Sequence, residues 1–340
     1  MDIFVPEDYP DRLLWSNERV LQRAPSASGR NRLHRIWKKF CWIKFLLQYD
    51  VIYSFGKIVT ISNISGVPID LLMVLFRICG TSLVNSPSGC LDEAPKSFWG
   101  ARDNGTICGN CAFFSNCHES DSLLNIEIAN RHQIKIAGTW SNPMRYMDHV
   151  QHFKARSFNL EVYKPTIEVP KHLVWRDDLK INIIHSFMSN GRGSSARNIK
   201  GSHYLISSIS HLRSSGRQIN LLNPTDIRSS DMRFLQVQAD IAVDQLIYGW
   251  WGSTTLECLA LGVPVICYLS HDFLKFFHER FPDLEIPVIN ANPKNIESVL
   301  RDLVDDPKRR ADLQIKSRSF AEEFLDADSN VIELLRFFKK

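Results

Sequence analysis

A polar, glycine-containing segment in the second half of the chain carries the strongest chemical signal. Gly252 precedes Ser253, Thr254 and Thr255, and Glu257 follows two residues later. If a helix begins at Ser253, its first N–H groups favour an anion, phosphate above all. Glu257 then lies one turn in, where a carboxylate can reach two neighbouring hydroxyls such as a ribose edge. Helix capping explains each residue singly, but it does not explain the whole segment.

Two basic residues upstream could hold the charge of a departing diphosphate. Residues 197–202 read RNIKGS, so Arg197 and Lys200 lie three positions apart, just before a predicted helix. Preorganised cations stabilise charge that develops in a transition state, and removing such a group typically costs about 3–4 kcal/mol of barrier. Arg192 is a further cation in the same stretch. The alternative interpretation is a solvated basic loop.

These residues need a scaffold, and the hydrophobic pattern predicts one of alternating strands and helices. Strand-length apolar runs occur at 181–187, 218–222, 240–246, 265–268 and 288–290, with helical spacing at 202–214, 232–237, 253–261 and 295–337. In the first half we expect strands at 50–55, 82–85 and 134–137 and a helix near 69–78. Such alternation is typical of βαβ units, whose ligands bind at the carboxyl ends of parallel strands. Residues 161–176 are expected to link the two halves.

From Asp240 to Ile266 the chain resembles the donor-binding domain of GT-B glycosyltransferases, in particular the large retaining family four. The family's glutamate-x-[ML]-A-x-G-x-P-V-[IV] pattern stands here as ECLALGVPVI, starting at Glu257. Asp240 and Gly252 match the aspartate and glycine that precede it, and RNIKGS is similar to the family's R-x-x-K-G-[ST] element. The family usually carries a second acidic residue eight positions before the glutamate, where this chain has Gly249.

The resemblance implies an α/β fold of two Rossmann-like domains facing a cleft. Residues 1–165 are then the acceptor-side domain, residues 175–325 the donor-binding domain, and residues 326–340 a C-terminal helix that packs back on the first domain. The resemblance covers about residues 180–290. We find neither an opening strand nor a glycine-rich loop at the start of the chain, so the first domain is expected to be reduced or truncated.

The resemblance also implies roles for single residues. Arg197 and Lys200 are expected to clamp the donor diphosphate during catalysis, the amides of residues 253–255 to meet phosphate, and Glu257 to hold the ribose. The residues expected to bind the donor are Ser186, Arg197, Lys200, Asp244, Gln245, Gly252, Ser253, Thr254, Thr255 and Glu257. No catalytic base is evident, which is tolerable because the leaving phosphate can assist in such enzymes.

The activity expected from these residues is sugar transfer, with retention, from a UDP- or GDP-sugar to a glycan or lipid-linked acceptor. Such an enzyme serves cell-surface polysaccharide or glycoconjugate synthesis and needs no cofactor for the chemistry. A nucleotide-sugar epimerase on the same fold is an alternative, although the acid and base groups it requires are not evident. A non-catalytic basic or zinc-bearing interaction module is a second alternative.

Four cysteines gather in the first half, at Cys90, Cys108, Cys111 and Cys117. The stretch from Ser86 to His118 shows no periodicity, and a long loop needs something to order it. Its cysteines therefore predict a structural zinc site, the alternative being reduced thiols. Asp92 in this stretch is a candidate acceptor contact, or else it caps a turn. The single cysteines Cys41, Cys79, Cys258 and Cys267 are expected to be small buried hydrophobes.

Length, charge and the N-terminal region set the remaining expectations. The 340 residues, 44% of them hydrophobic, suffice for two domain cores, and the net charge of +4 is too mild to indicate nucleic-acid binding. No signal peptide or membrane-spanning run is evident, so a cytoplasmic location is expected. The helix expected from Arg30 to Leu47 is basic and amphipathic, which predicts peripheral contact with the inner face of a membrane or, equally, ordinary core packing.

Overall fold

The computed structural model describes residues 3–6, 20–24, 32–87, 90–102, 106–111, 114–138, 146–152, 157–186, 198–224 and 227–339. The chain divides into two compact units. The first comprises Met1–Trp99, Cys117–Phe153 and Leu334–Lys340, and the second comprises Gly100–Asn116 and Lys154–Glu333. Residues 100–116 therefore belong to the second unit, although the sequence placed them with the first half.

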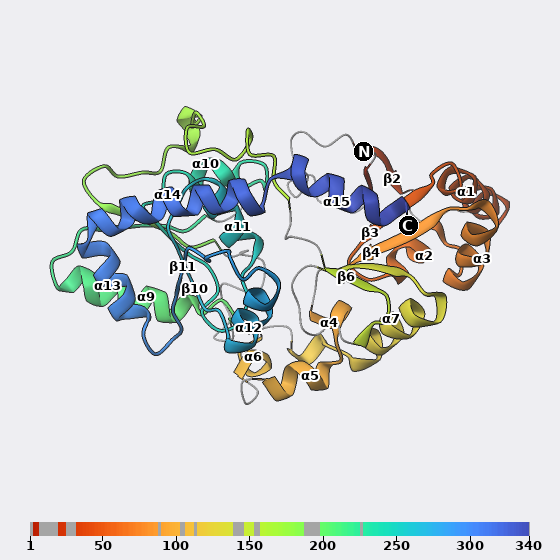
Figure 1. Ribbon diagram of the computed structural model, residues 1–340, viewed down its shortest axis with the longest axis horizontal. Helices are drawn as coiled ribbons and strands as arrows, with labels where there is room; N and C mark the ends of the chain where they lie inside the picture. Colours follow the sequence, from red (N-terminus) through yellow and green to blue (C-terminus); the bar gives the residue numbers. More distant parts are fainter. Residues whose placement is uncertain are drawn as a thin grey trace. The chain divides into compact units, whose positions relative to one another are not determined.

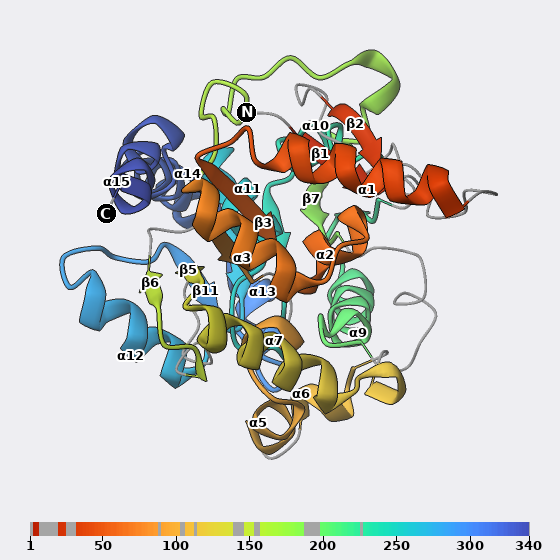
Figure 2. The ribbon, with the colours of Figure 1, turned by 90° about the vertical axis from the view of Figure 1, so that its right-hand side faces the viewer.

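The first unit is built on a parallel sheet with the strand order β3-β4-β5-β6. Its strands are β3 (Val51–Phe55), β4 (Ser82–Ser86), β5 (Lys135–Gly138) and β6 (Val150–His152), and a separate parallel pair is formed by β1 (Ile3–Pro6) and β2 (Val20–Ala24). Its helices include α1 (Arg32–Leu46), α2 (Val59–Ser65), α3 (Ile69–Cys79), α4 (Cys90–Glu93) and α7 (Glu119–His132), and α5 (Lys96–Ala101) starts in this unit (Figures 1 and 2). Apolar side chains from α1, α2, α3 and α7 share one core with β4 and β5.

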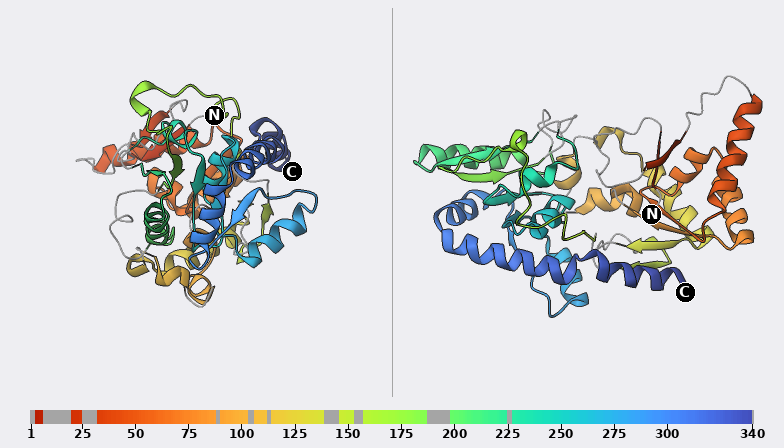
Figure 3. Two further views of the ribbon diagram at one scale, coloured as in Figure 1. Left: turned by 90° about the vertical axis from the view of Figure 1, so that its left-hand side faces the viewer. Right: turned by 90° about the horizontal axis from the view of Figure 1, so that it is seen from above.

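The second unit has a five-stranded parallel sheet with the order β11-β10-β9-β7-β8. Its strands are β7 (Ile181–Ile184), β8 (Ile219–Leu222), β9 (Ile241–Val243), β10 (Val265–Cys267) and β11 (Val288–Asn290). Its helices include α6 (Thr106–Gly109), α9 (Ser202–Ser214), α10 (Met232–Gln236), α11 (Ser253–Ala260), α12 (His271–Arg280), α13 (Ile296–Asp305) and α14 (Pro307–Phe324) (Figure 3). α15 (Ala327–Lys339) starts in this unit, and its residues from Leu334 belong to the first unit. The expected alternation of strands and helices is confirmed.

Strand order in the second unit creates one topological switch point. From β7 the chain moves to β8 on one side, then crosses to β9 on the other side of β7. Connections leaving β7 and β9 therefore diverge, and an open α/β sheet binds its ligands in the crevice beyond the carboxyl ends of such strands. The candidate site lies at this point.

The cysteine-rich segment differs from the expected irregular loop. It forms the short helices α4, α5 and α6 and a 3₁₀ turn at Phe114–Asn116. Two of its side chains, Trp99 and Ile107, are buried at 2% and 4% exposure, so apolar packing orders the segment. Of the single cysteines, Cys258 and Cys267 are buried as expected, but Cys41 and Cys79 are exposed.

Within the described part of the chain, no helix is both long and apolar enough to cross a bilayer.

Candidate functional site

The switch point brings together the two segments that the sequence singled out. His185 and Ser186 directly follow β7, and Asp244 and Gln245 directly follow β9. Lys200 joins them from the turn before α9, since its carbonyl accepts a hydrogen bond from the Leu246 amide at 3.1 Å. Two separate motifs thus meet beyond the carboxyl ends of neighbouring strands.

The Asp244 carboxylate is the centre of this arrangement. It is fully buried, and its Oδ1 lies 3.0 Å from Lys200 Nζ. Its Oδ2 accepts hydrogen bonds from the Gly252 amide at 2.9 Å and from Thr255 Oγ1 at 2.8 Å. One side chain therefore connects the turn before α9 that contains Lys200, here called the basic turn, to the first turn of α11. Asp244, expected from the sequence to bind the donor, positions Lys200, Gly252 and Thr255 in the structure, and its contact with a donor stays a prediction.

Burial alone would raise the pKa of Asp244, but the Lys200 ammonium and the hydrogen bonds from Thr255 and Gly252 outweigh it. The net effect lowers the pKa of this carboxyl below its ordinary value. Asp244 is thus an anion at neutral pH, and it neutralises Lys200 from the protein side.

Lys200 is held in place by two acceptors. Its Nζ donates to the Ser186 carbonyl at 2.8 Å as well as to Asp244. An ammonium group has three protons, and within the described residues the third has no protein acceptor. The side chain keeps 15% exposure, so this proton is available to an anionic ligand.

A buried histidine contacts the start of α9, directly after the basic turn. His185 Nδ1 lies 2.8 Å from the Val243 carbonyl and Nε2 lies 2.7 Å from Ser202 Oγ. Because a carbonyl only accepts, Nδ1 carries the proton and Nε2 accepts from the Ser202 hydroxyl. Ser202 Oγ in turn accepts from Asn198 Nδ2 at 2.8 Å. Burial lowers the pKa of His185 to about 4, so the ring is neutral and structural rather than an acid or base at neutral pH.

The start of α11 presents the remaining polar groups. Ser186 Oγ and Thr254 Oγ1 lie 3.3 Å apart, so hydroxyls from both segments meet here. Glu257, one turn further along, is 8% exposed, and its Oε2 accepts from Gln236 Nε2 at 2.6 Å. Gln236 fixes the orientation of this carboxylate, and no sequence signal pointed to it.

The two glycines of the turn are required by packing. A Cβ at Gly252 would lie 2.9 Å from Asp244 Oδ2, and one at Gly249 would lie 3.0 Å from Ser270 Cβ, where φ is also +81°. The sequence interpretation of Gly252 was close approach to a ligand, whereas the structure shows close approach to Asp244. Gln245 stiffens the same turn, since its Nε2 donates to the Trp250 carbonyl at 3.3 Å.

Arg102 is a second residue that the sequence did not indicate. Its guanidinium lies over the Trp250 ring at 3.5 Å from the centroid, and Nη2 donates to Ser270 Oγ at 2.9 Å. Ser270 caps α12, and its amide donates to the Gly249 carbonyl at 2.9 Å. Arg102 therefore attaches residues 100–116 to the turn beside the candidate site.

Arg197 and Arg192 lie outside the described residues. Asp92 lies in α4 of the first unit, 7% exposed, and its carbonyl accepts from Asn125 Nδ2 at 2.9 Å.

The four predicted zinc ligands are divided between the two units. Cys90 and Cys117 belong to the first unit and Cys108 and Cys111 to the second. Across the described ranges, no three His, Cys, Asp or Glu side chains could hold a metal ion together. The packing of α4 to α6 removes the reason for which zinc was inferred. Zinc here stays a prediction without structural support, and elemental analysis of purified protein tests it.

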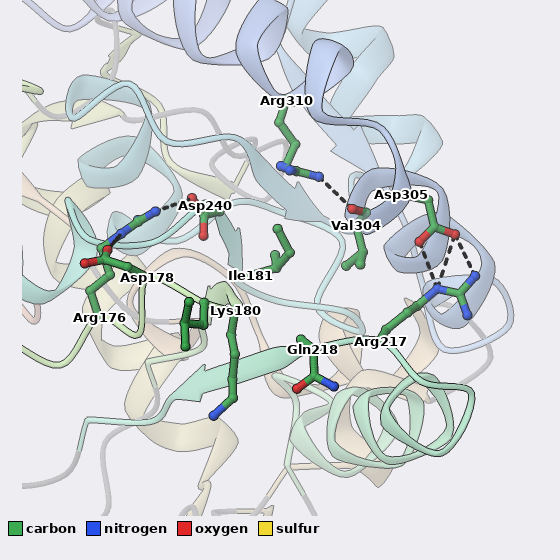
Figure 4. Close-up of a pocket in the computed structure, with 11 residues that line it drawn as sticks. Arg176, Asp178, Lys180, Ile181, Arg217, Gln218, Asp240, Val304, Asp305 and Arg310 are labelled. Carbon is green, nitrogen blue, oxygen red and sulfur yellow. Dashed lines mark hydrogen bonds and ion pairs between the residues drawn. The ribbon is translucent and has the colours of Figure 1, made fainter.

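A cavity of about 460 Å³ lies at the opposite, amino-terminal end of the same sheet (Figure 4). Its charged residues all have protein partners, with Lys180 paired to Asp177 and Arg310 donating to the Leu303 and Val304 carbonyls. Arg176 pairs with Asp178 and Asp240, and Arg217 pairs with Asp305 at 2.6 Å. With its charges paired and strand amino ends around it, this cavity does not fit the predicted donor.

Comparison with solved structures identifies the fold. HepE from Anabaena, solved in complex with UDP-glucose, superposes with a TM-score of 0.58 over 88% of this chain and 81% of its own, at 11% identity. Sucrose-phosphate synthase from Thermosynechococcus elongatus gives a TM-score of 0.60 over 99% of this chain and 88% of its own, also at 11% identity. WaaG, a glycosyltransferase involved in lipopolysaccharide biosynthesis, gives 0.51 over 88% and 82% at 12% identity.

The chain therefore has the GT-B fold of glycosyltransferases, as the resemblance implied. No protein-family model and no curated protein sequence matches it.

Proposed function

We propose that this protein is a glycosyltransferase that moves a sugar from a UDP- or GDP-sugar to a glycan or lipid-linked acceptor. Its place is the inner face of a membrane, in the synthesis of cell-surface polysaccharide or glycoconjugate. The GT-B fold and the donor-site motif support the reaction class, and HepE, solved with UDP-glucose, supports a nucleotide-sugar donor.

One observation carries the proposal, the Asp244-centred link between Lys200 and the first turn of α11. It holds an ammonium group and a helix N-terminus together at the sheet's switch point. A diphosphate is the ligand that uses both, because cations and N-terminal amides favour the same anionic oxygens. Glu257, whose carboxylate is held by Gln236, is the residue that we expect to bind the ribose of that nucleotide.

The chemistry follows from the charge that the diphosphate gains as it leaves. Lys200 Nζ is held by Asp244 and the Ser186 carbonyl, so we expect it to stabilise this charge with little reorganisation. A neutral His185 cannot serve as the acid at neutral pH, and no other residue of the site is assigned as a base. Retention is proposed on the same ground, with the leaving phosphate assisting departure and attack on one face of the sugar.

Isothermal titration with UDP, GDP and ADP tests the donor site. Wild-type protein should bind a uridine or guanosine diphosphate, and Glu257→Ala should weaken that binding roughly 10- to 100-fold through lost charge-assisted hydrogen bonds. Glu297→Gln, an exposed carboxylate on α13 paired with His211, is the matched control and should leave the affinity unchanged. An unaltered dissociation constant in folded Glu257→Ala would remove this residue from the site.

Kinetics separate binding from catalysis. Lys200→Ala should lower turnover at saturating donor more than it lowers donor affinity, because the charge on the diphosphate grows during transfer. If donor affinity and kcat/KM fall equally while turnover at saturating donor stays intact, Lys200 is a binding residue only. Binding without transfer to any acceptor would favour the non-catalytic alternative, and interconversion of the donor sugar would favour an epimerase.

A further inference from the structure

Helix α1 exposes an apolar face that the core of the first unit does not use. Ile36, Trp37 and Phe40 are 57%, 64% and 59% exposed, and the Trp37 and Phe40 rings stack at 6.3 Å. Phe40 follows Ile36 by four residues and Trp37 by three, so its side chain lies between those two on one side of the helix. Large side chains exposed together in this way mark an interaction site.

The anchoring of α1 lies elsewhere on the helix. Trp42 and Leu46, both 7% exposed, join the core cluster that contains Phe76 and Ile136. The sequence placed Ile36 and Phe40 on one apolar face with Ile43. In the structure Ile43 packs partly against the core while the first two are exposed. Core packing, the alternative considered for this helix, thus accounts for Trp42 and Leu46 but not for Ile36, Trp37 and Phe40.

The charged residues in the sequence of α1 all have the same sign. The helix contains Arg32, Arg35, Lys38, Lys39 and Lys44 and no acidic residue. From Arg19 to Tyr49 the chain has eight Lys or Arg and no Asp or Glu. A surface that accepts this helix must therefore be anionic and must also offer an apolar phase.

We propose that α1 docks on an anionic phospholipid bilayer, with Ile36, Trp37 and Phe40 inserted at the boundary between headgroups and acyl chains. Trp and Phe on one face of a basic helix suit this boundary, and anionic headgroups attract the basic residues. A nucleic acid would match the charge but offers no apolar phase for Ile36. The inference deepens the proposed function, on which it rests for its purpose, because a lipid-linked acceptor is met at a bilayer.

Vesicle flotation tests the proposal with the full-length chain. The protein should float with vesicles of equal parts phosphatidylglycerol and phosphatidylcholine, and not with phosphatidylcholine alone. The double variant Trp37→Ser/Phe40→Ser should bind these vesicles at least roughly tenfold more weakly, since two apolar side chains no longer leave water. Ile315→Ser on α14 replaces an equally exposed apolar residue (69%) in the second unit, and it should float as the wild type does.

Trp fluorescence and salt supply independent readouts. Insertion should shift Trp37 emission to the blue, and high salt should release the protein as the Debye length falls to about 3 Å at 1 M. Absence of flotation with anionic vesicles, or flotation unaltered in the double variant, would overturn the assignment. So would a wild-type dimer in sedimentation that Trp37→Ser/Phe40→Ser dissolves, because a second copy would then cover this face.

Failure of this proposal is distinguishable from failure of the proposed function. The double variant lies in the first unit and the donor-site residues in the second. It should therefore keep wild-type affinity for the nucleoside diphosphate and a wild-type circular dichroism spectrum. Lost donor binding in wild-type protein with flotation intact would overturn the transferase and leave the bilayer contact standing.

Discussion

Asp244 acts on the candidate site through the residues that it holds in place. Its carboxylate is fully buried and serves Lys200, Gly252 and Thr255 together. A buried ion pair is weak evidence for net stability, yet removal of one partner leaves an uncompensated charge. The pair therefore acts chiefly by fixing the Lys200 ammonium against α11.

Asp244→Asn should destabilise the protein by about 3–5 kcal/mol, since the Lys200 charge is then left in a largely buried setting without its counterion. Urea unfolding measures the change. Asp178→Asn is the matched control, because Asp178 is 89% exposed in its pair with Arg176. This variant should lose no more than about 1 kcal/mol of unfolding free energy. Similar losses in both variants would mean that the Lys200 pair is solvated.

Protonation of His185 should give stability a pH dependence of its own. The folded-state pKa is about 4 against 6.5 for the free side chain, so the unfolded chain binds the proton first as pH falls. The contribution of neutral His185 to the free energy of unfolding is complete above about pH 6.5 and is lost as pH falls toward 4. This contribution amounts to about 3 kcal/mol, because the folded and unfolded pKa values differ by about 2.5 and a difference of one in pKa corresponds to about 1.36 kcal/mol.

Comparison of wild-type and His185→Gln unfolding between pH 7 and pH 4.5 isolates this contribution. The variant should be less stable at pH 7, and the difference should shrink on acidification. A constant difference across that range would show that His185 is protonated in the folded protein as readily as in the unfolded chain.

At the scale of elements, the turn before α9 depends on a left-handed glycine. Gly201 has φ of +73°, and a Cβ there would lie 2.9 Å from Leu246 Cβ. Gly201→Ala should therefore cost roughly 1–3 kcal/mol of stability from backbone strain, with the clash in addition, and it should weaken donor binding through Lys200. Gly216→Ala provides the control, because φ is +91° with nothing within 4 Å, so only strain remains. Equal losses in the two variants would exclude the Leu246 clash.

Elements with a regular apolar period were predictable from the sequence, and others were not. The helix at 202–214 matches α9 because Leu205, Ile209 and Leu212 keep helical spacing into the core. α7 was missed because its buried residues include Ser122 and Asn125, which carry no hydrophobic signal. The helices of the cysteine-rich segment are too short to show a period at all.

The site was predictable where its residues are close in sequence. Glu257 and Lys200 stand in local motifs, and the structure places both at the switch point. Gln236 and Arg102 act on residues 21 and 168 positions away, and no local pattern reports such pairings. Burial likewise decided that Asp244 positions other groups, since exposure cannot be read from a motif.

For the whole molecule, every described residue of the proposed donor site lies in the second unit. A saturating nucleoside diphosphate should therefore slow hydrogen exchange in peptides covering 198–205 and 244–257, and leave 51–87 unchanged. At 100 times its dissociation constant a ligand stabilises the state that binds it by about 2.7 kcal/mol, enough for a clear difference. Protection confined to the first unit would place the nucleotide elsewhere.

The path of the chain through the two units has a consequence for synthesis on the ribosome. The first unit is interrupted twice, and Leu334–Lys340 belongs to it although all of the second unit comes before. Nascent strands β3 to β6 can pair early, but their unit gains the helical residues Leu334–Lys340 only after the sheet of the second unit has been translated. Translation order and folding order therefore differ: residues 154–333 of the second unit are made before Leu334–Lys340, which return to the part that was made first.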